Sequence, residues 1–338
     1  MTRTSPRSRL RAVAVLTVAA SLALAGCNDS GPGGKDGPGD QNIAGGGTLS
    51  GRWPLTGLPA EGDAPDYPVM VVKIDNTAPS RPQVGLGRAD LVAEELVEGG
   101  VTRLAVFYYS SLPKTVGPVR SIRATDIGIV KPARGVIVAS GGARLTVRRM
   151  KEANLRTLTE NDGAGFYRDD ARAAPYNLFN NLPELAETLN SPGVPESYLP
   201  WGDEKHFPPG PRATGIGVQF SPAQTTNWQY RAGSYVNLTS QAKDVDRFVP
   251  KTVLVLRVRI GDAGYLDPGG NPVPETKFTG TGQAMVFHGG RMVRGTWRKP
   301  GLDAPLSLMR NGKKLSVPAG KVWMELVPVN GGNVAVRP

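Results

Sequence analysis

The chain contains a single cysteine, Cys27, among its 338 residues. Because no disulfide can form within it, the fold must be held together by a hydrophobic core and by hydrogen bonds. Cys27 follows an apolar run over residues 12–25, which is shorter than the about 20 residues that a membrane-spanning helix needs. The residues before that run include four cations, Arg3, Arg7, Arg9 and Arg11. This layout is typical of a secretory signal peptide, so residues 1–26 are excluded from the folded part.

The tetrapeptide LAGC, residues 24–27, resembles the lipobox of bacterial lipoproteins. The resemblance implies that Cys27 is diacylated through its thiol, for example with palmitate, and becomes the mature N-terminus. Two acyl chains give stable anchoring, since each buried CH₂ contributes about 0.8 kcal/mol. We therefore expect a protein held at the extracytoplasmic face of the cell membrane. Residues 27–52 are rich in Gly, Asp and Pro, which predicts a flexible tether.

The charge of the chain makes some partners less plausible than others. Removing residues 1–26 leaves 36 basic and 29 acidic residues, a net charge of +7. The basic residues are scattered, which argues against nucleic-acid binding. The basic excess suits either a solubilising surface or contact with anionic lipid headgroups and wall polymers. His206 and His288 have no second ligand at metal spacing and no cofactor fingerprint is present, so we expect neither a metal nor a cofactor.

Two halves of the chain differ in their patterns, which predicts an α+β fold with two unlike subdomains. Residues 53–195 alternate short valine-rich runs with helical patterns, which favours a mixed α/β sheet. A proline-rich connection follows over residues 196–212. Residues 213–338 contain short strands with Gly and Asn-Gly turns at close spacing, typical of a mostly antiparallel β subdomain. In the first half the expected strands are 67–75, 90–98, 101–110 and 135–140, and the expected helices are 143–155 and 182–190.

The segments on either side of Gly99-Gly100 predict a β-hairpin, with a helix in the first segment as the alternative. A two-residue turn would place Glu94, Glu98 and Arg103 on one face, because side chains alternate along a strand. That face is either a solvated surface with a weak ion pair or a functional surface on a rigid element. If the chain is a hydrolase, Glu94 and Glu98 are the candidate acid and base.

The stretch GPVRSIR predicts the start of a helix with Ser121 as its N-cap. Arg120 and Arg123 would then crowd the positive end of that helix, which calls for a negative partner. The partner is either a bound anion or the chain's own carboxylates from the hairpin, and the sequence leaves both open. The later Gly141-Gly142 turn could also hold an anion through its backbone amides.

A series of short motifs follows the chain from residue 54 onward. They are PLTGLP (54–59), KIDN (73–76), SRPQVGL (80–86), AD (89–90), VEGGVTR (97–103), GPVRSIR (117–123), SGG (140–142), FYRD (166–169) and APYNLF (174–179). Together they resemble the YerB-like family of bacterial lipoproteins, over most of residues 53–185. The likeness extends more loosely through AMVFHGG and PAGKVWMELVP in the C-terminal half. It implies two unlike α+β subdomains and an envelope location; the family has no established activity.

The resemblance points to one group of positions: Arg81, Glu98, Thr102, Arg103, Arg120, Ser121 and Arg123. Family members often carry a histidine before the Gly-Gly turn, where this chain has Ala139 and Ser140, so a mechanism that needs an imidazole there is not expected. The leading interpretation is a lipid-anchored protein that binds an anionic ligand or a cell-envelope component through these arginines, with Glu98 orienting them. Two alternatives remain: a carboxylate-dependent hydrolase of cell-wall glycan or peptide, and a scaffold in an envelope protein complex.

Overall fold

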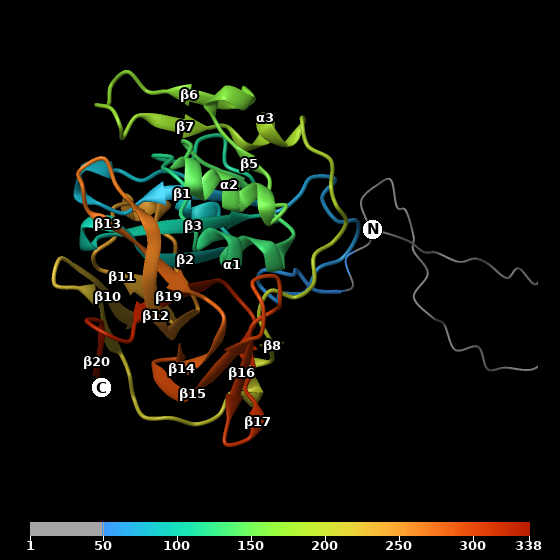
Figure 1. Cartoon of the computed structure of the whole chain (residues 1–338). Coiled ribbons are helices and arrows are strands. Elements are labelled where there is room, and N and C mark those ends of the chain that lie inside the picture. Colours follow the sequence, from blue (N-terminus) through green and yellow to red (C-terminus); the bar gives the residue numbers. More distant parts are fainter. Residues whose placement is uncertain (1–48, 50) are drawn as a thin grey trace, which may run out of the picture. The chain divides into compact units, whose positions relative to one another are not determined.

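The computed structural model describes residue 49 and residues 51–338 (Figure 1). The predicted signal peptide, Cys27 and nearly all of the tether over residues 27–52 lie outside the described residues. The described residues belong to one compact unit. Leu49, the first of them, packs with Ala60 and Ala64 in a small apolar cluster.

One twelve-stranded sheet runs through this unit, and both halves of the chain contribute strands to it. In their order across the sheet, the strands are β17 (Lys313–Lys314), β16 (Ser307–Arg310), β15 (Arg291–Lys299), β14 (Gly280–His288), β12 (Thr252–Leu266), β19 (Val322–Pro328), β2 (Leu91–Leu96), β3 (Thr102–Tyr108), β1 (Met70–Asp75), β4 (Val136–Val138) and β5 (Thr157–Leu158). The twelfth strand, β13 (Pro272–Lys277), pairs with the end of β12. We call this the central sheet.

The two halves of the chain join within the central sheet. Strand β19 pairs in parallel with β2, so that Val322 lies beside Leu91 and Glu325 beside Glu94. Strand β12 then pairs in parallel with β19 and continues the sheet into the C-terminal strands. The two subdomains expected from the sequence therefore share one continuous sheet.

Three smaller sheets and three α-helices complete the described part of the chain. A four-stranded antiparallel sheet has the order β11 (Ser234–Asn237), β10 (Gln224–Arg231), β9 (Gly215–Ser221) and β20 (Asn333–Arg337). The two-stranded sheets are β6 (Phe166–Arg168) with β7 (Leu178–Asn180), and β8 (Trp201–Gly202) with β18 (Val317–Pro318). The helices are α1 (Asp126–Val130), α2 (Arg144–Glu152) and α3 (Leu182–Ala186).

The described residues are thus mostly sheet, which corrects the expected α+β class. The helices predicted over 143–155 and 182–190 are present as α2 and α3, but they have only nine and five residues. The valine-rich runs predicted as strands are present as β1, β2, β3 and β4. In the C-terminal half, β14 to β17 are antiparallel as expected, whereas β12 and β19 pair in parallel.

Both faces of the central sheet are buried, and they contribute to different hydrophobic clusters. Alternate residues of β2 show this: Leu91 and Ala93 pack with residues of α1 and α2, whereas Val92 packs with residues of the four-stranded sheet. We call these the helix face and the sheet face. Strands buried on both faces read as continuous apolar runs, which is why the sequence revealed them. Any charged side chain on β1, β2 or β3 therefore needs a partner inside the protein.

The hairpin of β2 and β3 is confirmed, but its register differs from the expected one by one residue. The Val97 amide donates to the Val101 carbonyl over 2.9 Å, which closes a three-residue loop over Glu98–Gly100. Arg103 consequently lies opposite Glu95, not opposite Leu96. Because a shift of one residue exchanges the two faces of a strand, Arg103 shares the helix face with Glu95.

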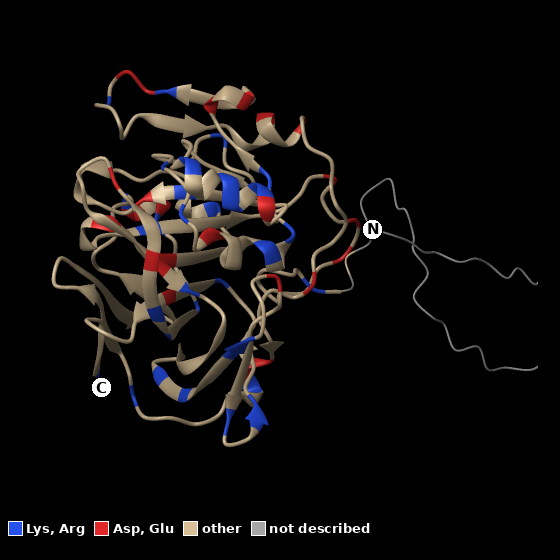
Figure 2. Cartoon of the chain, viewed as in Figure 1, with Lys and Arg blue, Asp and Glu red and all other residues tan. Residues whose placement is uncertain are grey.

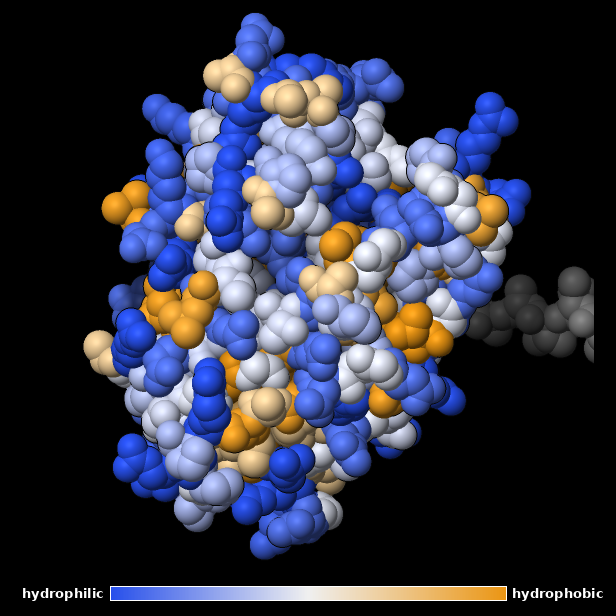
Figure 3. Space-filling view, turned by 90° about the vertical axis from the view of Figure 1, so that its left-hand side faces the viewer, coloured by the Kyte–Doolittle hydropathy of each residue, from blue (hydrophilic) through white to orange (hydrophobic). Residues whose placement is uncertain are grey.

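Charged and apolar residues are spread over the surface of the unit. Figure 2 shows basic and acidic residues on most elements, with several Lys and Arg on α2. The face shown in Figure 3 is mainly hydrophilic, and its apolar residues form small separate groups. Small apolar groups are common on soluble protein surfaces, so this face gives no indication of a large docking patch.

Candidate functional site

The candidate site lies at the carboxyl ends of β1, β2 and β4. The segment with Arg120 and Ser121 runs extended between two strand ends: the Arg120 amide donates to the Lys73 carbonyl (2.8 Å), and the Ser140 amide donates to the Arg120 carbonyl (3.1 Å). Helix α1 begins only at Asp126, so the prediction of a helix capped by Ser121 is wrong. The backbone here pairs with strand ends instead of closing a helical turn. The carboxyl ends of parallel strands, such as β1 and β4 here, are where α/β proteins commonly bind ligands.

Two arginines converge on one carboxylate, that of Glu98. Arg123 donates from Nε to Glu98 Oε2 over 2.7 Å and from Nη2 to Oε1, and Arg103 Nη2 donates to Oε1 over 3.2 Å. The three side chains are largely buried, with 8–13% of their side-chain surface exposed. The double hydrogen bond fixes the plane of the Arg123 guanidinium. The internal carboxylate that the sequence left open as a partner is therefore present.

Glu98 cannot neutralise both arginines. Burial acts to raise its pKa, but the hydrogen bond from Arg123 and the charges of both arginines hold the pKa of Glu98 below its usual value. Burial, together with the charge of Arg123, lowers the pKa of Arg103 to about 10, which leaves Arg103 cationic at neutral pH. Two positive charges thus face one negative charge.

Arg120 turns toward a different partner. Its Nε lies 3.2 Å from Asp75 Oδ2, and its Nη1 donates to the Pro175 carbonyl over 3.2 Å. The guanidinium also stands over the ring of Tyr176, 5.3 Å from the ring centre, in a cation–π contact. Arg120 therefore ties the edge of the central sheet to the segment between β6 and β7.

A second charge cluster lies on the helix face. Lys73 Nζ donates to Glu95 Oε1 over 2.5 Å and to Asp126 Oδ1 over 2.6 Å, and none of these side chains is exposed. Asp126 also accepts the Arg123 amide at 2.7 Å, which links the two clusters. Burial and the charge of Asp126 raise the pKa of Glu95 to about 7. Lys73 and Glu95 were not predicted as site residues, although a lysine inside the valine-rich run over 67–75 was an available signal.

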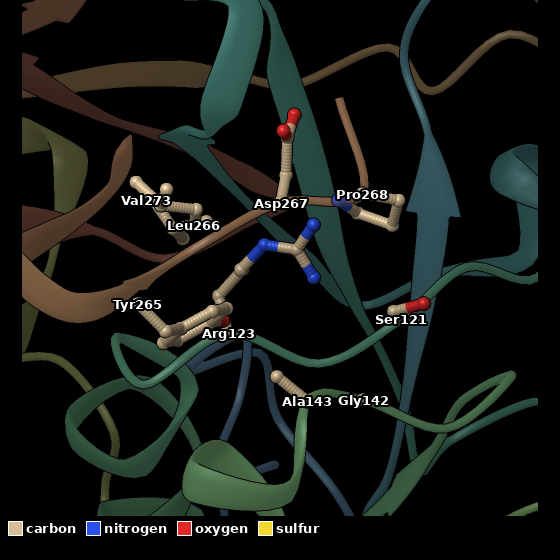
Figure 4. Close-up of a pocket in the computed structure, with 9 residues that line it drawn as sticks. All are labelled: Ser121, Arg123, Gly142, Ala143, Tyr265, Leu266, Asp267, Pro268 and Val273. Carbon is tan, nitrogen blue, oxygen red and sulfur yellow. The ribbon is translucent and has the colours of Figure 1, made fainter. Parts of the chain in front are cut away.

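A pocket of about 460 Å³ opens beside Arg123 (Figure 4). Its lining residues are Ser121, Arg123, Gly142, Ala143, Tyr265, Leu266, Asp267, Pro268 and Val273. The Arg123 guanidinium lies in the middle of this set, with the Tyr265 ring beside its stem. The structure thus brings Ser121 and Arg123 together, and it places Gly142 of the Gly-Gly turn, which the sequence analysis considered separately, at the same pocket. The hairpin of β12 and β13 was missed, because its contact with Arg123 depends on long-range packing.

The walls of this pocket have both signs of charge. Asp267 is its one carboxylate among the lining residues, and hydrogen bonds from Asn271 lower the pKa of Asp267, with a smaller contribution from Arg123. Opposite Asp267, Ala143 marks the start of α2, whose first turn has no acidic residue and no side-chain cap. The amides at such a helix start have partial positive charge and favour an anion.

Arg81 and Thr102 lie away from the pocket beside Arg123. Arg81 Nε donates to Gln241 Oε1, and Arg81 lines a separate pocket of about 450 Å³ together with Tyr167. Thr102 lies on the sheet face, where its hydroxyl donates to Glu94 over 2.7 Å. The positions singled out from the sequence are therefore divided among the Glu98 cluster, a second pocket and the far face of the sheet.

Glu94 is fully buried on the sheet face, whereas Glu98 lies with the arginines on the helix face. Glu94 accepts hydrogen bonds from the Thr226 hydroxyl (2.9 Å) and from Trp323 Nε1 (3.2 Å). Glu94 is enclosed on the sheet face of β2, whereas Glu98 lies in the loop after β2 with the arginines, so the two carboxyl groups do not flank one cleft. Carboxylates that hydrolyse a glycosidic bond stand on either side of it.

Glu325 of β19 lies beside Glu94 and was not predicted from the sequence. It is fully buried and accepts a hydrogen bond from Trp228 Nε1 over 2.8 Å. Burial raises the pKa of both carboxyl groups, and the charge of Glu94 raises the pKa of Glu325 further. Among the described residues no cation pairs with either group. We therefore describe Glu94 and Glu325 as a pair that retains a proton at neutral pH.

The described part of the chain contains neither a metal-binding cluster nor a membrane-spanning helix. Within residues 49 and 51–338, no group of three or more His, Cys, Asp or Glu side chains is arranged to hold a metal ion. In the same part of the chain, every helix is too short or too polar to cross a membrane.

Comparisons with known proteins place these features in a family. The sequence matches the family described as Protein of unknown function (DUF3048), with its N-terminal domain over residues 55–194 and its C-terminal domain over residues 216–324. YerB of Bacillus subtilis (strain 168), which is named as a lipoprotein, is 24% identical over 287 residues, covering 81% of this chain and 86% of YerB. A crystal structure of YerB from Bacillus subtilis matches with a TM-score of 0.70 at 21% identity, covering 84% of this chain and 99% of that chain. These findings confirm the YerB-like resemblance, and the structural match shows a shared fold.

Proposed function

The chain belongs to the DUF3048 family, and on that premise we propose that it is a lipid-anchored protein of the extracytoplasmic face of the cell membrane which binds an anionic ligand of the envelope beside Arg123. The LAGC motif before Cys27 supports the anchor, as does the lipoprotein name of the similar Bacillus subtilis protein. Two acyl chains on one cysteine hold a protein stably on a bilayer.

The ligand part of the proposal rests on one observation: Arg123 is oriented by Glu98 and also lines the pocket of about 460 Å³. Since Arg103 shares the same carboxylate, the cluster keeps one positive charge that Glu98 does not balance. A carboxylate or phosphate group in the pocket would offset this charge, because guanidinium groups bind planar oxyanions strongly.

Neighbouring groups suit the same kind of ligand. The Ser121 hydroxyl lies at the pocket wall, 3.2 Å from the Ser140 hydroxyl, and can donate to an anion. The start of α2 at Ala143 adds the positive end of a nine-residue helix. The Tyr265 ring offers an apolar surface beside the charge of Arg123. Binding sites for small molecules commonly combine an apolar surface with a few polar groups in this way.

Binding is the role that these observations favour over hydrolysis. Glu94 is sealed inside the protein, and Glu98 is occupied by two arginines. The anionic ligand proposed is a wall polymer or wall fragment, because the anchor would hold the folded part within reach of the wall. A carboxylate or phosphate of such a polymer would be the group that meets Arg123.

The test uses the full-length protein in neutral detergent and soluble wall fragments released by muramidase digestion. Ser121→Glu places a negative charge at the pocket wall, whereas Ser121→Gln has nearly the same size without the charge. We expect the Glu variant to bind the fragments at least tenfold more weakly than the Gln variant, by calorimetric titration. Equal binding by the two variants, or no binding by the unmodified protein, would contradict the ligand part of the proposal. Palmitate labelling of the unmodified chain and its absence in Cys27→Ser test the anchor separately.

A further inference from the structure

Another pocket, of about 400 Å³, lies at the amino ends of β4 and β5, the strand ends opposite to those at the candidate site. It is lined by Pro68, Lys131, Arg134, Gly135, Val136, Asn154, Leu155, Arg156, Asn190 and Pro192. We propose that this pocket binds the phosphate group of an anionic phospholipid headgroup. The three cations Lys131, Arg134 and Arg156 would hold the phosphate, and the asparagine amides would donate to its ester or glycerol oxygens.

The charge of this lining set is the first argument. It contains three cations and no carboxylate, whereas Asp267 and Asp169 line the two pockets described above. Among the described residues, no carboxylate lies within salt-bridge distance of Lys131, Arg134 or Arg156. Three like charges around one concavity repel one another, and a bound phosphate removes that repulsion.

The backbone supplies the second argument. Arg134 has a φ of 49°, in the left-handed region where a residue with a side chain is strained and glycine is not. It stands at the end of the 3-10 turn Lys131–Ala133 that continues α1, a position commonly occupied by glycine. Asn154 after α2 also has a left-handed φ, of 51°. Asparagine is tolerated there, so Arg134 is the one lining residue whose backbone strain suggests that its side chain serves a purpose.

The third argument concerns the membrane, and this step rests on the proposed anchor at Cys27. The pocket includes Pro68 and Asn190, whose neighbours are joined by a hydrogen bond from the Ser191 amide to the Asp66 carbonyl (2.8 Å). The same two segments pack with the start of the described chain, since Val194 contacts the cluster of Leu49. The pocket therefore lies beside the place where the folded part begins.

Chain length allows the pocket to meet the bilayer. Leu49 lies 22 positions after Cys27, a length of chain that spans at most about 75 Å when fully extended. A lipid-anchored chain with a tether of this reach keeps its folded part at high local concentration near the headgroups. Basic groups close to an anionic leaflet are attracted to it within a Debye length. Figure 2 shows basic residues around the end of α1 as well as on α2, which supplies this attraction.

The test measures binding of water-soluble short-chain lipids to the full-length protein in neutral detergent. The probes are dihexanoylphosphatidylglycerol, dihexanoylphosphatidylcholine and inorganic phosphate, each followed by calorimetric titration. We expect the anionic lipid to bind at least tenfold more tightly than either other probe, with affinity falling as salt is raised.

Variants separate the pocket from net charge and from folding. Arg134→Gly removes one cation and also relieves the left-handed strain, so we expect at least tenfold weaker lipid binding with an unchanged or higher Tm. Arg148→Ser removes the same charge from an exposed position on α2 outside the pocket and should change the affinity less than twofold. Equal losses in the two variants would overturn the proposal, because net charge alone would then account for binding.

Two further outcomes overturn the assignment of the ligand. Inorganic phosphate that binds as tightly as the anionic lipid would identify a site for free phosphate instead. Equal binding of both lipids would mean that the acyl chains, and not the headgroup charge, are recognised. The Cys27→Ser variant should bind the soluble lipid normally, so a failure of the proposed anchor and a failure of this site are distinguishable.

Discussion

Glu94 and Glu95 are neighbours on β2 and both are fully buried, yet they face opposite sides of the central sheet. On the helix face, Glu95 pairs with Lys73, and that cluster continues through Asp126 to the arginines at the pocket. On the sheet face, Glu94 is surrounded by hydroxyl, amide and indole donors and by the carboxyl group of Glu325.

The difference shows two ways to bury a carboxyl group. A cation beside the carboxyl group opposes the rise in pKa that burial causes, and the pair can be linked to further ions that reach the surface, as Arg123 does. A proton kept on the carboxyl group removes its charge, so that hydrogen bonds within the protein suffice to satisfy the buried group. We therefore expect ligand recognition on the helix face and a purely structural role on the sheet face.

Lys73→Met should have the largest effect, since it leaves Glu95 and Asp126 buried without their cation. Removing one partner of a buried ion pair costs about 3–5 kcal/mol of unfolding free energy. Urea unfolding at pH 7 measures this loss. Lys277→Met is the matched control, because Lys277 is 44% exposed and its partner Glu275 also pairs with Arg149. A loss for Lys73→Met no greater than that for the control would show that the helix face does not depend on charge.

Glu325→Gln should remove a pH dependence of stability. The folded pKa of Glu325 is raised above its usual 4.5, so the folded state keeps a proton that the unfolded state releases above that pH. The contribution of Glu325 to the free energy of unfolding is fully present below pH 4.5. As pH rises above 4.5, this contribution falls by about 1.4 kcal/mol per pH unit until the pKa of the folded state is reached. We expect the stability of the variant relative to the unmodified protein to improve as pH rises from 4.5 to 7, by up to about 1.4 kcal/mol per pH unit. Parallel curves for both proteins would contradict a retained proton.

Glu98→Gln should give a smaller effect of the opposite sign. The folded pKa of Glu98 is held below 4.5, so its stabilisation is present above that pH and is lost as pH falls through the folded value. The variant should lose about 1–2 kcal/mol of unfolding free energy at pH 7. This loss lies in the lower part of the range for charged hydrogen bonds, because the Glu98 side chain is partly exposed to water. At pH 3 the difference in unfolding free energy between the variant and the unmodified protein should be smaller. Urea unfolding of both proteins at pH 7 and at pH 3 measures the two losses. Equal losses at the two pH values would mean that the arginines do not keep Glu98 ionised.

The strands could be predicted because both faces of the sheet are buried, so runs such as MVVKID stand out by composition. The register of the hairpin could not, because Gly99-Gly100 is compatible with both a two-residue turn and the observed three-residue loop. That single residue decided which glutamate faces Arg103. The predicted helix start at Ser121 is wrong for a related reason: the backbone of the adjacent Arg120 pairs with Lys73 and Ser140, which lie elsewhere in the sequence.

The site was foreseen only in part. A carboxylate of the hairpin, here Glu98, was one of the two partners left open for the arginines, and Gly142, whose turn was considered separately as an anion site, lines the same pocket. The partnership of Glu94 with Glu325 could not be foreseen, because 230 residues separate them and the parallel pairing of β2 with β19 has no local signature. The pattern of a single sequence does not reveal which strands pair when they are far apart along the chain.

Protonation of the glutamates can be read directly from their carboxyl carbons by ¹³C NMR, with assignments from Glu→Gln variants. At pH 6 we predict that the Glu98 carbon has the chemical shift of an ionised carboxylate, whereas the Glu325 carbon has that of a protonated acid. An ionised Glu325 together with a protonated Glu98 at that pH would contradict the account of the two faces.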